Sequence, residues 1–282
     1  MGNKVSENNS GYTNTMTKPF KSTRHAAPPE TPIHEPPRLG RRESEPHSLG
    51  IHRIYDILST NFPNDRVIID LHHYFYLEGE KIDIQFDLTY FKNFKLAHTL
   101  SSYDSMKFDK KVPVMAINIL SKSTYLKDLG YTRDLCQTLK IPIYVLFSTH
   151  NISISLYKPP FLRVHILNEQ GKYKEITIRG ELYDEDGRIL EKNIIDTSQI
   201  VPFKLSLMKS ELIHEDGSPN YYLVFLDPVT NKPFPTRSEL EKARADKEKA
   251  RADKEKARAD KEKARADQLE RMLEEYKQKK NA

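Results

Sequence analysis

The pattern of apolar and polar positions separates a structured middle of the chain from two polar ends. Apolar residues recur at helical spacing over residues 49–60. Two runs rich in β-branched and aromatic residues follow, over 67–77 and 82–91, and they predict strands. A nearly continuous apolar run over 112–120 is typical of a central strand that is buried on both faces.

The predicted strand over 82–91 alternates between apolar and polar residues, so its two faces are expected to differ. One face is expected to carry Ile82, Ile84, Phe86, Leu88 and Tyr90. The opposite face is expected to carry Asp83, Gln85, Asp87 and Thr89. The alternation therefore predicts that the carboxylates of Asp83 and Asp87 share one polar face.

Helical spacing returns over 128–139, where Cys136 is expected to be a small buried residue. A strand is predicted over 141–147, and further strands follow with a hairpin turn at Asp186-Gly187. The order α-β-β-β-α-β, with these additional strands, predicts an α/β (α+β) domain over residues 48–235.

The two ends of the chain have different compositions. Residues 1–47 are rich in Ser, Asn, Pro and basic residues and show no apolar period, so a disordered N-terminal arm is expected. Residues 236–282 begin with Thr236 and Glu239 at the spacing of a capping box, and they predict a long, charged, solvated helix.

A seven-residue repeat, Glu-Lys-Ala-Arg-Ala-Asp-Lys, runs through this helix from Glu241 to about Asp267. Its alanines are spaced alternately by two and five residues, whereas a coiled-coil seam needs spacings of three and four. Opposite charges four apart, such as Arg251 and Glu255, instead predict a single helix in solvent. Only its end is expected to pair with another chain, through Leu269, Met272, Leu273 and Tyr276.

Composition adds few constraints. The formal net charge of +5 is compatible with DNA as a partner without requiring it. The single cysteine excludes an intrachain disulfide, and the chain has no apolar run long enough for a membrane span, so a cytoplasmic protein is expected. Residues 1–6 also fit the pattern for N-myristoylation of Gly2.

The carboxylates at 83 and 87 suggest one chemistry. Nucleases commonly hold a divalent metal with carboxylates and place a Lys nearby. In the PD-(D/E)XK arrangement these groups come from two adjacent strands of an α-β-β-β-α-β core. Asp87 lies where the second strand supplies its Asp, with Asp83 on the same face. The alternative is that both are surface carboxylates on an edge strand.

Several ordered stretches carry a resemblance over about residues 49–275. Residues 84–88 match a Pro-Asp strand, and 112–121 match an apolar strand that ends in Glu-Val/Ile-Leu-Ser. Residues 141–144 match the approach to a further strand, and 231–236 with the charged repeat match a C-terminal tail. Ser123, Thr124, Asp128 and Gly130 fall at the corresponding spacing. In this order and spacing the chain resembles the Uma-two family of restriction endonucleases.

The resemblance implies a restriction-endonuclease-like fold and Mg²⁺-dependent DNA cleavage. It implies catalytic roles for Asp87, Asn118 and Arg133, and metal binding by Asp87, Asn118 and Asp83. The chain departs from the family at three of its positions, where Asn118 replaces a Glu, Thr132 replaces a Lys and Phe86 replaces a Pro.

These departures weaken the implied activity. An uncharged amide at Asn118 is a poor Mg²⁺ ligand. Arg133, one position after Thr132, supplies positive charge but cannot deprotonate as a Lys can.

Three functional interpretations follow. The preferred one is a restriction-endonuclease-like protein whose metal-dependent cleavage is weakened or lost and which binds nucleic acid or acts as a scaffold. The rival is an active Mg²⁺-dependent DNA endonuclease that uses Asp87, Asn118 and Arg133, with Asp83 or Asp128 as a second acidic ligand. The third is a membrane-tethered adaptor acylated at Gly2. The first two require Asp87 and Asn118 to meet between neighbouring strands.

Overall fold

The structure is a computed structural model that describes residues 44–280. Residues 1–43 lie outside the described residues, and with them most of the predicted N-terminal arm and the acylation pattern at Gly2. Of the helices that are described, none combines the length and the apolar character that crossing a lipid bilayer demands.

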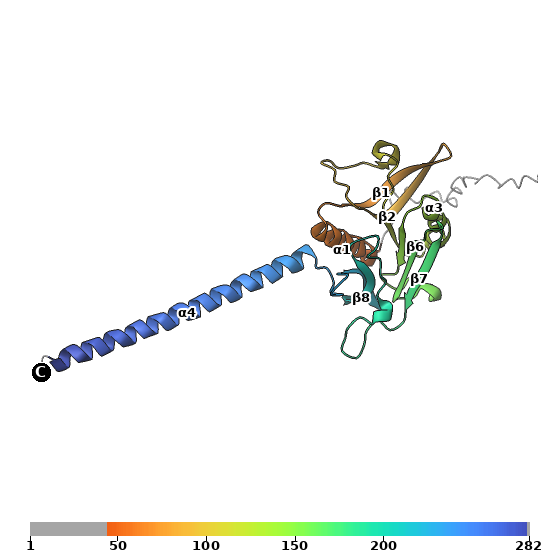
Figure 1. The fold of residues 1–282 in the computed structure, drawn as a ribbon. Coiled ribbons are helices and arrows are strands. Elements are labelled where there is room, and N and C mark those ends of the chain that lie inside the picture. The colour runs from red at the N-terminus through yellow and green to blue at the C-terminus, as the bar shows by residue number, and fades with distance from the viewer. Residues whose placement is uncertain (1–43, 281–282) are drawn as a thin grey trace, which may run out of the picture. The chain divides into compact units, whose positions relative to one another are not determined.

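A seven-stranded mixed sheet forms the centre of the α+β domain (Figure 1). In chain order its strands are β1 (Arg66–Leu77), β2 (Glu80–Phe91), β3 (Tyr103–Asp104), β4 (Met115–Ile119), β5 (Ile143–Phe147), β6 (Phe161–Leu167) and β7 (Tyr173–Arg179). They lie side by side in the order β3-β1-β2-β4-β5-β6-β7. Strands β4 and β5 are parallel, as are β1 and β3, and the other neighbours are antiparallel.

Each face of the sheet is covered by a different layer. Strand β4 shows this, because Met115, Ile117 and Ile119 enter one hydrophobic cluster while Ala116 enters the other. The first cluster is closed by helix α1 (Glu45–Asn61) and by a two-stranded sheet of β8 (Lys204–Ile213) and β9 (Pro219–Leu226). The second is closed by a helical segment of α2 (Tyr125–Lys127), the π-helical turn η2 (Asp128–Thr132) and α3 (Arg133–Thr138).

Most of the predicted elements are present, with changed bounds. Three short 3-10 helices, η1 (Ser105–Phe108), η3 (Ser155–Tyr157) and η4 (Glu191–Asn193), were not expected. Helix α1 begins at Glu45 rather than Leu49, with Pro46 in its first turn, so the predicted arm is too long at its C-terminal end. The helix expected over 128–139 starts earlier and contains a π-turn.

The predicted alternation along β2 is wrong in one respect. Ile84 and Phe86 belong to one core cluster, whereas Leu88 and Tyr90 belong to the other. In a regular strand these four residues, each two apart, would all lie on one face. The strand therefore changes the face it presents at Asp87. The neighbouring strand β1 is irregular opposite Asp87, because Asp70 there has a positive φ of 45°.

Other local predictions are confirmed. His72 is exposed whereas its neighbour His73 is fully buried, where it bonds to the hydroxyl of Thr89, so the two rings face opposite sides. Cys136 is buried in the second core cluster. The turn at Asp186-Gly187 closes a short antiparallel bridge.

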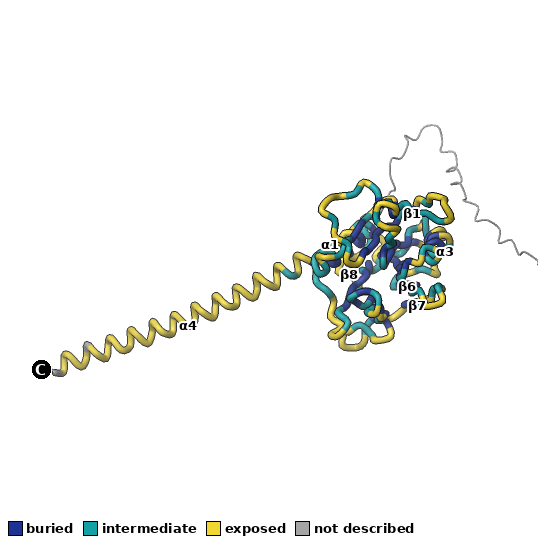
Figure 2. The backbone as a smooth tube through the Cα atoms, turned by 45° about the horizontal axis from the view of Figure 1, so that its top comes forward, coloured by how far each residue is buried: buried dark blue, intermediate teal, exposed yellow. Residues whose placement is uncertain are grey.

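Helix α4 (Arg237–Lys280) is 44 residues long. The predicted capping box is present: the Thr236 N–H donates to Glu239 Oε2 at 2.7 Å, and the Glu239 N–H donates to Thr236 Oγ1 at 3.3 Å. Its first residues contact α1, where the Arg237 N–H donates to the Asp56 carboxylate at 2.9 Å. From Glu241 onward the described residues are exposed (Figure 2). The expected pair Arg251–Glu255 forms at 3.4 Å.

Gly50 lets α1 approach the sheet closely. A Cβ at this position would lie 3.0 Å from Ile119 Cδ1 and 3.0 Å from Thr149 Cγ2. Gly130 is also helical, but a Cβ there would meet no atom within 4 Å. The two glycines therefore differ in the space around them and not in the conformation they need.

Alanine at the two glycines tests this packing. Both substitutions gain a similar intrinsic helix propensity. Only Gly50→Ala crowds the end of β4, so it is expected to be less stable than Gly130→Ala by about 1–3 kcal/mol. Urea denaturation of both variants measures the difference, and equal stabilities would mean that α1 is not held closely against β4.

Candidate functional site

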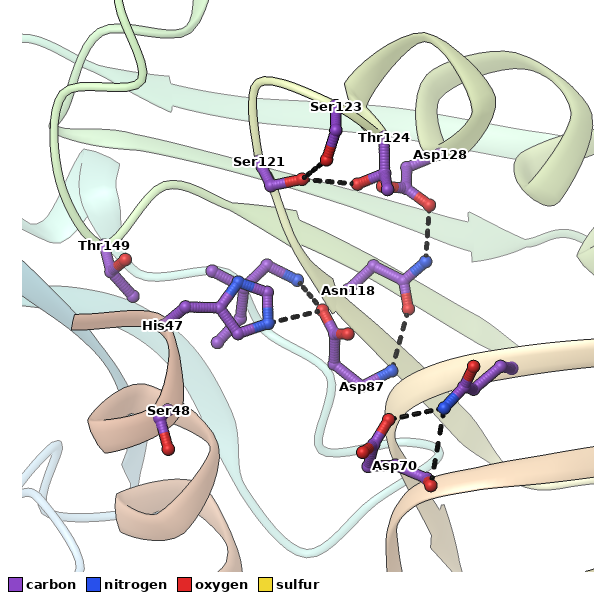
Figure 3. Close-up of polar contacts among 12 residues, drawn as sticks. His47, Ser48, Asp70, Asp87, Asn118, Ser121, Ser123, Thr124, Asp128 and Thr149 are labelled. Atoms are coloured by element: carbon purple, nitrogen blue, oxygen red, sulfur yellow. Dashed lines mark hydrogen bonds and ion pairs between the residues drawn. The ribbon is translucent and has the colours of Figure 1, made fainter. Parts of the chain in front are cut away.

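The candidate site lies where β2 and β4 separate. Their antiparallel pairing runs from Tyr90 opposite Met115 to Leu88 opposite Ile117 and ends there. Beyond it, side chains replace the backbone ladder (Figure 3): the Asp87 N–H donates to Asn118 Oδ1 at 3.2 Å, and the Ile119 N–H donates to Asp87 Oδ2 at 2.7 Å. Asp87 and Asn118 therefore meet, as the sequence predicted.

The Asn118 amide links Asp87 to a second carboxylate. Its Nδ2 donates to Asp128 Oδ1 at 2.8 Å, and Tyr144 Oη donates to the Asp128 backbone carbonyl at 3.0 Å. The orientation of the amide follows from its partners, because the Asp87 N–H can only donate and so needs the amide oxygen. Asn118 thus presents its NH₂ group, a donor, to Asp128.

His47 contacts Asp87 from the opposite side. This buried residue lies in the first turn of α1, and its Nε2 is 3.4 Å from Asp87 Oδ2. A protonated imidazole at this distance supplies positive charge beside the carboxylate. Figure 3 shows His47 and Asn118 on two sides of Asp87, which comes from β2.

Burial controls the protonation of Asp128. Loss of solvent raises the pKa of its carboxyl, and the nearby Asp87 carboxylate raises the pKa further. Hydrogen bonds from Thr124 and from Asn118 act in the opposite direction. Asp128 lies in the π-turn η2, so this wide turn positions the second carboxylate of the site.

Hydroxyl groups follow β4 at the edge of this network. Ser121 Oγ lies 2.8 Å from Thr124 Oγ1 and 3.2 Å from Ser123 Oγ. Figure 3 shows the three side chains together beside Asp128. The Ser-Thr stretch therefore joins the network through Thr124.

Two of the predicted site residues lie elsewhere. Asp83 is exposed on the hairpin and pairs with His72 Nδ1 at 2.8 Å, because the bend at Asp87 separates it from the face expected to carry both carboxylates. Arg133 is half-buried and pairs with Asp134 at 2.7 Å. Neither contacts the network. Thr132 is buried, but its hydroxyl has no hydrogen-bond partner among the described residues.

Sequence reasoning missed two members of the network. His47 was assigned to the arm, although Ser44, Glu45 and Pro46 before it are typical of a helix start and would have included it in α1. Tyr144 lies in a continuously apolar strand, where a buried tyrosine has no distinguishing pattern.

No family model matches the chain, and no curated protein matches it. Within residues 44–280, no three His, Cys, Asp or Glu side chains gather closely enough to hold a metal ion.

Asp128 makes stability depend on pH. Because its pKa is raised on folding, the folded state keeps a proton that the unfolded state has already released. Its contribution to stability is therefore lost as the pH rises above the ordinary carboxyl value of 3.8 and through the folded-state value.

Asp128→Asn has no proton to lose at this position. The unfolding free energy of the variant, relative to that of the wild type, is expected to increase as the pH rises from about 4 towards neutral. Urea denaturation at several pH values measures this difference, with Glu169→Gln, an exposed residue that forms no ion pair among the described residues, as the control. A pH-independent difference for Asp128→Asn would contradict the raised pKa.

Proposed function

We propose that this chain is a restriction-endonuclease-like protein that has lost metal-dependent DNA cleavage and acts as a scaffold. The observation that carries the proposal is the Asn118 amide, which bridges Asp87 and Asp128 where a nuclease would place a metal ligand. The resemblance of the sequence to the Uma-two family supports the same assignment.

The arrangement of the core supports the fold assignment. Strands β1, β2, β4 and β5 are neighbours in that order, and the successive pairs are antiparallel, antiparallel and parallel. Helices α1 and α3 pack on opposite faces. This order supports the α-β-β-β-α-β arrangement that the PD-(D/E)XK resemblance implies, with β3 and η1 inserted before β4.

The residues of the network do not fit a Mg²⁺ ion. Mg²⁺ needs near-octahedral coordination by oxygens, preferably charged ones. The oxygen of Asn118 already accepts the Asp87 N–H, and its nitrogen is a donor that cannot ligate a cation. Asp87 Oδ2 accepts the Ile119 N–H and also faces His47. Hydrogen bonds thus already engage the Asn118 oxygen and one carboxylate oxygen each of Asp87 and Asp128.

The cationic group of a nuclease site is also missing. Thr132 stands where the resemblance implies a Lys, and Arg133 is directed to Asp134 at the surface. Asp87 has the His47 ring as its neighbour instead, and that ring carries a charge only when it is protonated. An imidazole held against a carboxylate stabilises the fold, and it does not replace a metal that activates water.

The charge of the domain favours a scaffold over phosphate binding. Residues 44–235 contain 22 Lys and Arg and 24 Asp and Glu, so this part has a formal charge of −2. The positive excess of the chain lies in residues 1–43 and in the C-terminal helix. A surface that binds DNA without sequence preference needs a clear positive excess.

A cleavage assay tests the loss of activity. Full-length protein with plasmid DNA and either Mg²⁺ or Mn²⁺ is expected to cut no more than its Asp87→Ala variant. Gel electrophoresis of the plasmid forms is the measurement. Cleavage by the wild type that Asp87→Ala abolishes would refute the proposal. Tight, strongly salt-dependent DNA binding would replace the scaffold role with nucleic-acid binding.

Asn118→Asp tests why the site does not take a metal. The variant loses the donor to Asp128 and adds a third carboxylate, so without metal it is expected to be less stable by about 1–3 kcal/mol. Millimolar Mn²⁺ is expected to raise the Tm of the variant and to leave that of the wild type unchanged.

The matched control is Asp83→Asn, which alters a carboxylate outside the network and is expected to show no metal-dependent change. An equal rise of Tm with Mn²⁺ in wild type and Asn118→Asp would show that Asn118 does not exclude the ion.

A further inference from the structure

The C-terminal end of α4 carries an exposed apolar stripe. Leu269, Met272 and Tyr276 follow one another at intervals of three and four residues, and each side chain is more than half exposed. This spacing places them along one line of the helix, and Leu273 lies beside that line. We name the segment from Glu262 to Lys279 the tip.

The charged repeat continues the same line toward the N-terminus. Counting back by sevens from Leu269 reaches a Glu in every repeat, and counting back from Met272 reaches an Arg. The Glu positions are Glu262, Glu255, Glu248 and Glu241, and the Arg positions are Arg265, Arg258, Arg251 and Arg244. The alanines of the repeat do not lie on this line. The Glu and Arg positions do, and they are spaced alternately by three and four residues, as in a coiled-coil seam.

This order of charges discriminates between the two ways in which copies of the helix can pair. Parallel helices bring identical positions together, so Glu262, Arg265 and Lys279 would each face their own copy. Antiparallel helices bring the Leu269 series against the Met272 series. If the two helices overlap with the midpoint between Leu269 and Met272, each facing pair joins apolar side chains, opposite charges, or a cation and an aromatic ring.

We propose that the tip binds the tip of a second copy of this chain in antiparallel orientation. The six facing pairs are Glu262–Lys279, Arg265–Tyr276 and Leu269–Met272, each occurring twice by symmetry. The middle pairs bury apolar side chains, the next ones place a guanidinium against an aromatic ring, and the outer ones join opposite charges. This pairing does not depend on whether the domain cleaves DNA.

The overlap is limited to the tip because the repeat satisfies its own charges. N-terminal to the tip, Arg251 pairs with Glu255 at 3.4 Å within one helix. Glu262, the first residue of the tip, also lies 3.3 Å from Arg258 of its own helix, so the outer pair with Lys279 adds to this contact. A longer overlap would bury charged pairs without apolar gain. The interface is small, so the dimer is expected at protein concentrations on the order of 100 µM.

Charge exchange tests the orientation. Lys279→Glu places like charges at both outer pairs and is expected to weaken dimerisation of the full chain about tenfold in sedimentation equilibrium. Adding Glu262→Lys restores opposite charges only in the antiparallel pair, so the double variant is expected to recover. Lys277→Glu, which makes the same charge change off the line, is the control and leaves the dimer unchanged.

A distance measurement gives a second readout. In a Cys136→Ala background, a spin label at Ala259→Cys is expected to give an interchain distance of about 35 Å in the antiparallel pair, from 1.5 Å per residue. A parallel pair would place the labels within about 20 Å.

Circular dichroism confirms that each variant keeps its helix. A monomer at all concentrations, a short label distance or no recovery in the double variant would each overturn the proposal. Binding of the tip to lipid vesicles, with no dimer in their absence, would assign the stripe to a membrane surface instead.

Discussion

A single side-chain amide between two buried carboxylates determines the character of the site. Two carboxylates cannot lie close together in a low-dielectric interior without a cation, a proton or donors between them. Here Asn118 supplies a donor to Asp128 and an acceptor to the backbone of Asp87. An acidic residue at the same position would need a cation or a proton beside it, so the neutral amide is what closes the polar network.

The sheet creates the space for this network. Strand β2 changes face at Asp87, opposite the positive φ of Asp70. Its ladder with β4 ends at Leu88, the residue that follows Asp87 in the sequence. Backbone groups freed by the separation must find partners. The side chains of Asp87 and Asn118 provide them, so the residues that form the network also close the gap in the sheet.

Much of the core was predictable, because the spacing of apolar residues along the sequence determines which strands are buried. The runs over 67–77, 82–91 and 141–147 are apolar enough to place the strands, and the meeting of Asp87 with Asn118 followed from their order. The position of Asp83, exposed and away from the network, was not predictable, because a bend in a strand does not change the alternation of apolar and polar residues in the sequence. The position of Arg133 outside the network was not predictable, because it follows a π-turn that the sequence does not reveal. His47 was missed because the start of α1 was predicted four residues too far along the chain.

The π-turn has a consequence for how such a site changes over time. One extra residue in an α-helix rotates everything that follows by about 100° around the axis. The turn at Asp128–Thr132 therefore acts as a phase shift, and the side chains after it can be re-aimed by a single insertion or deletion. A lineage that gained or lost one codon here would change which side chains of α3 face the sheet without substituting any amino acid.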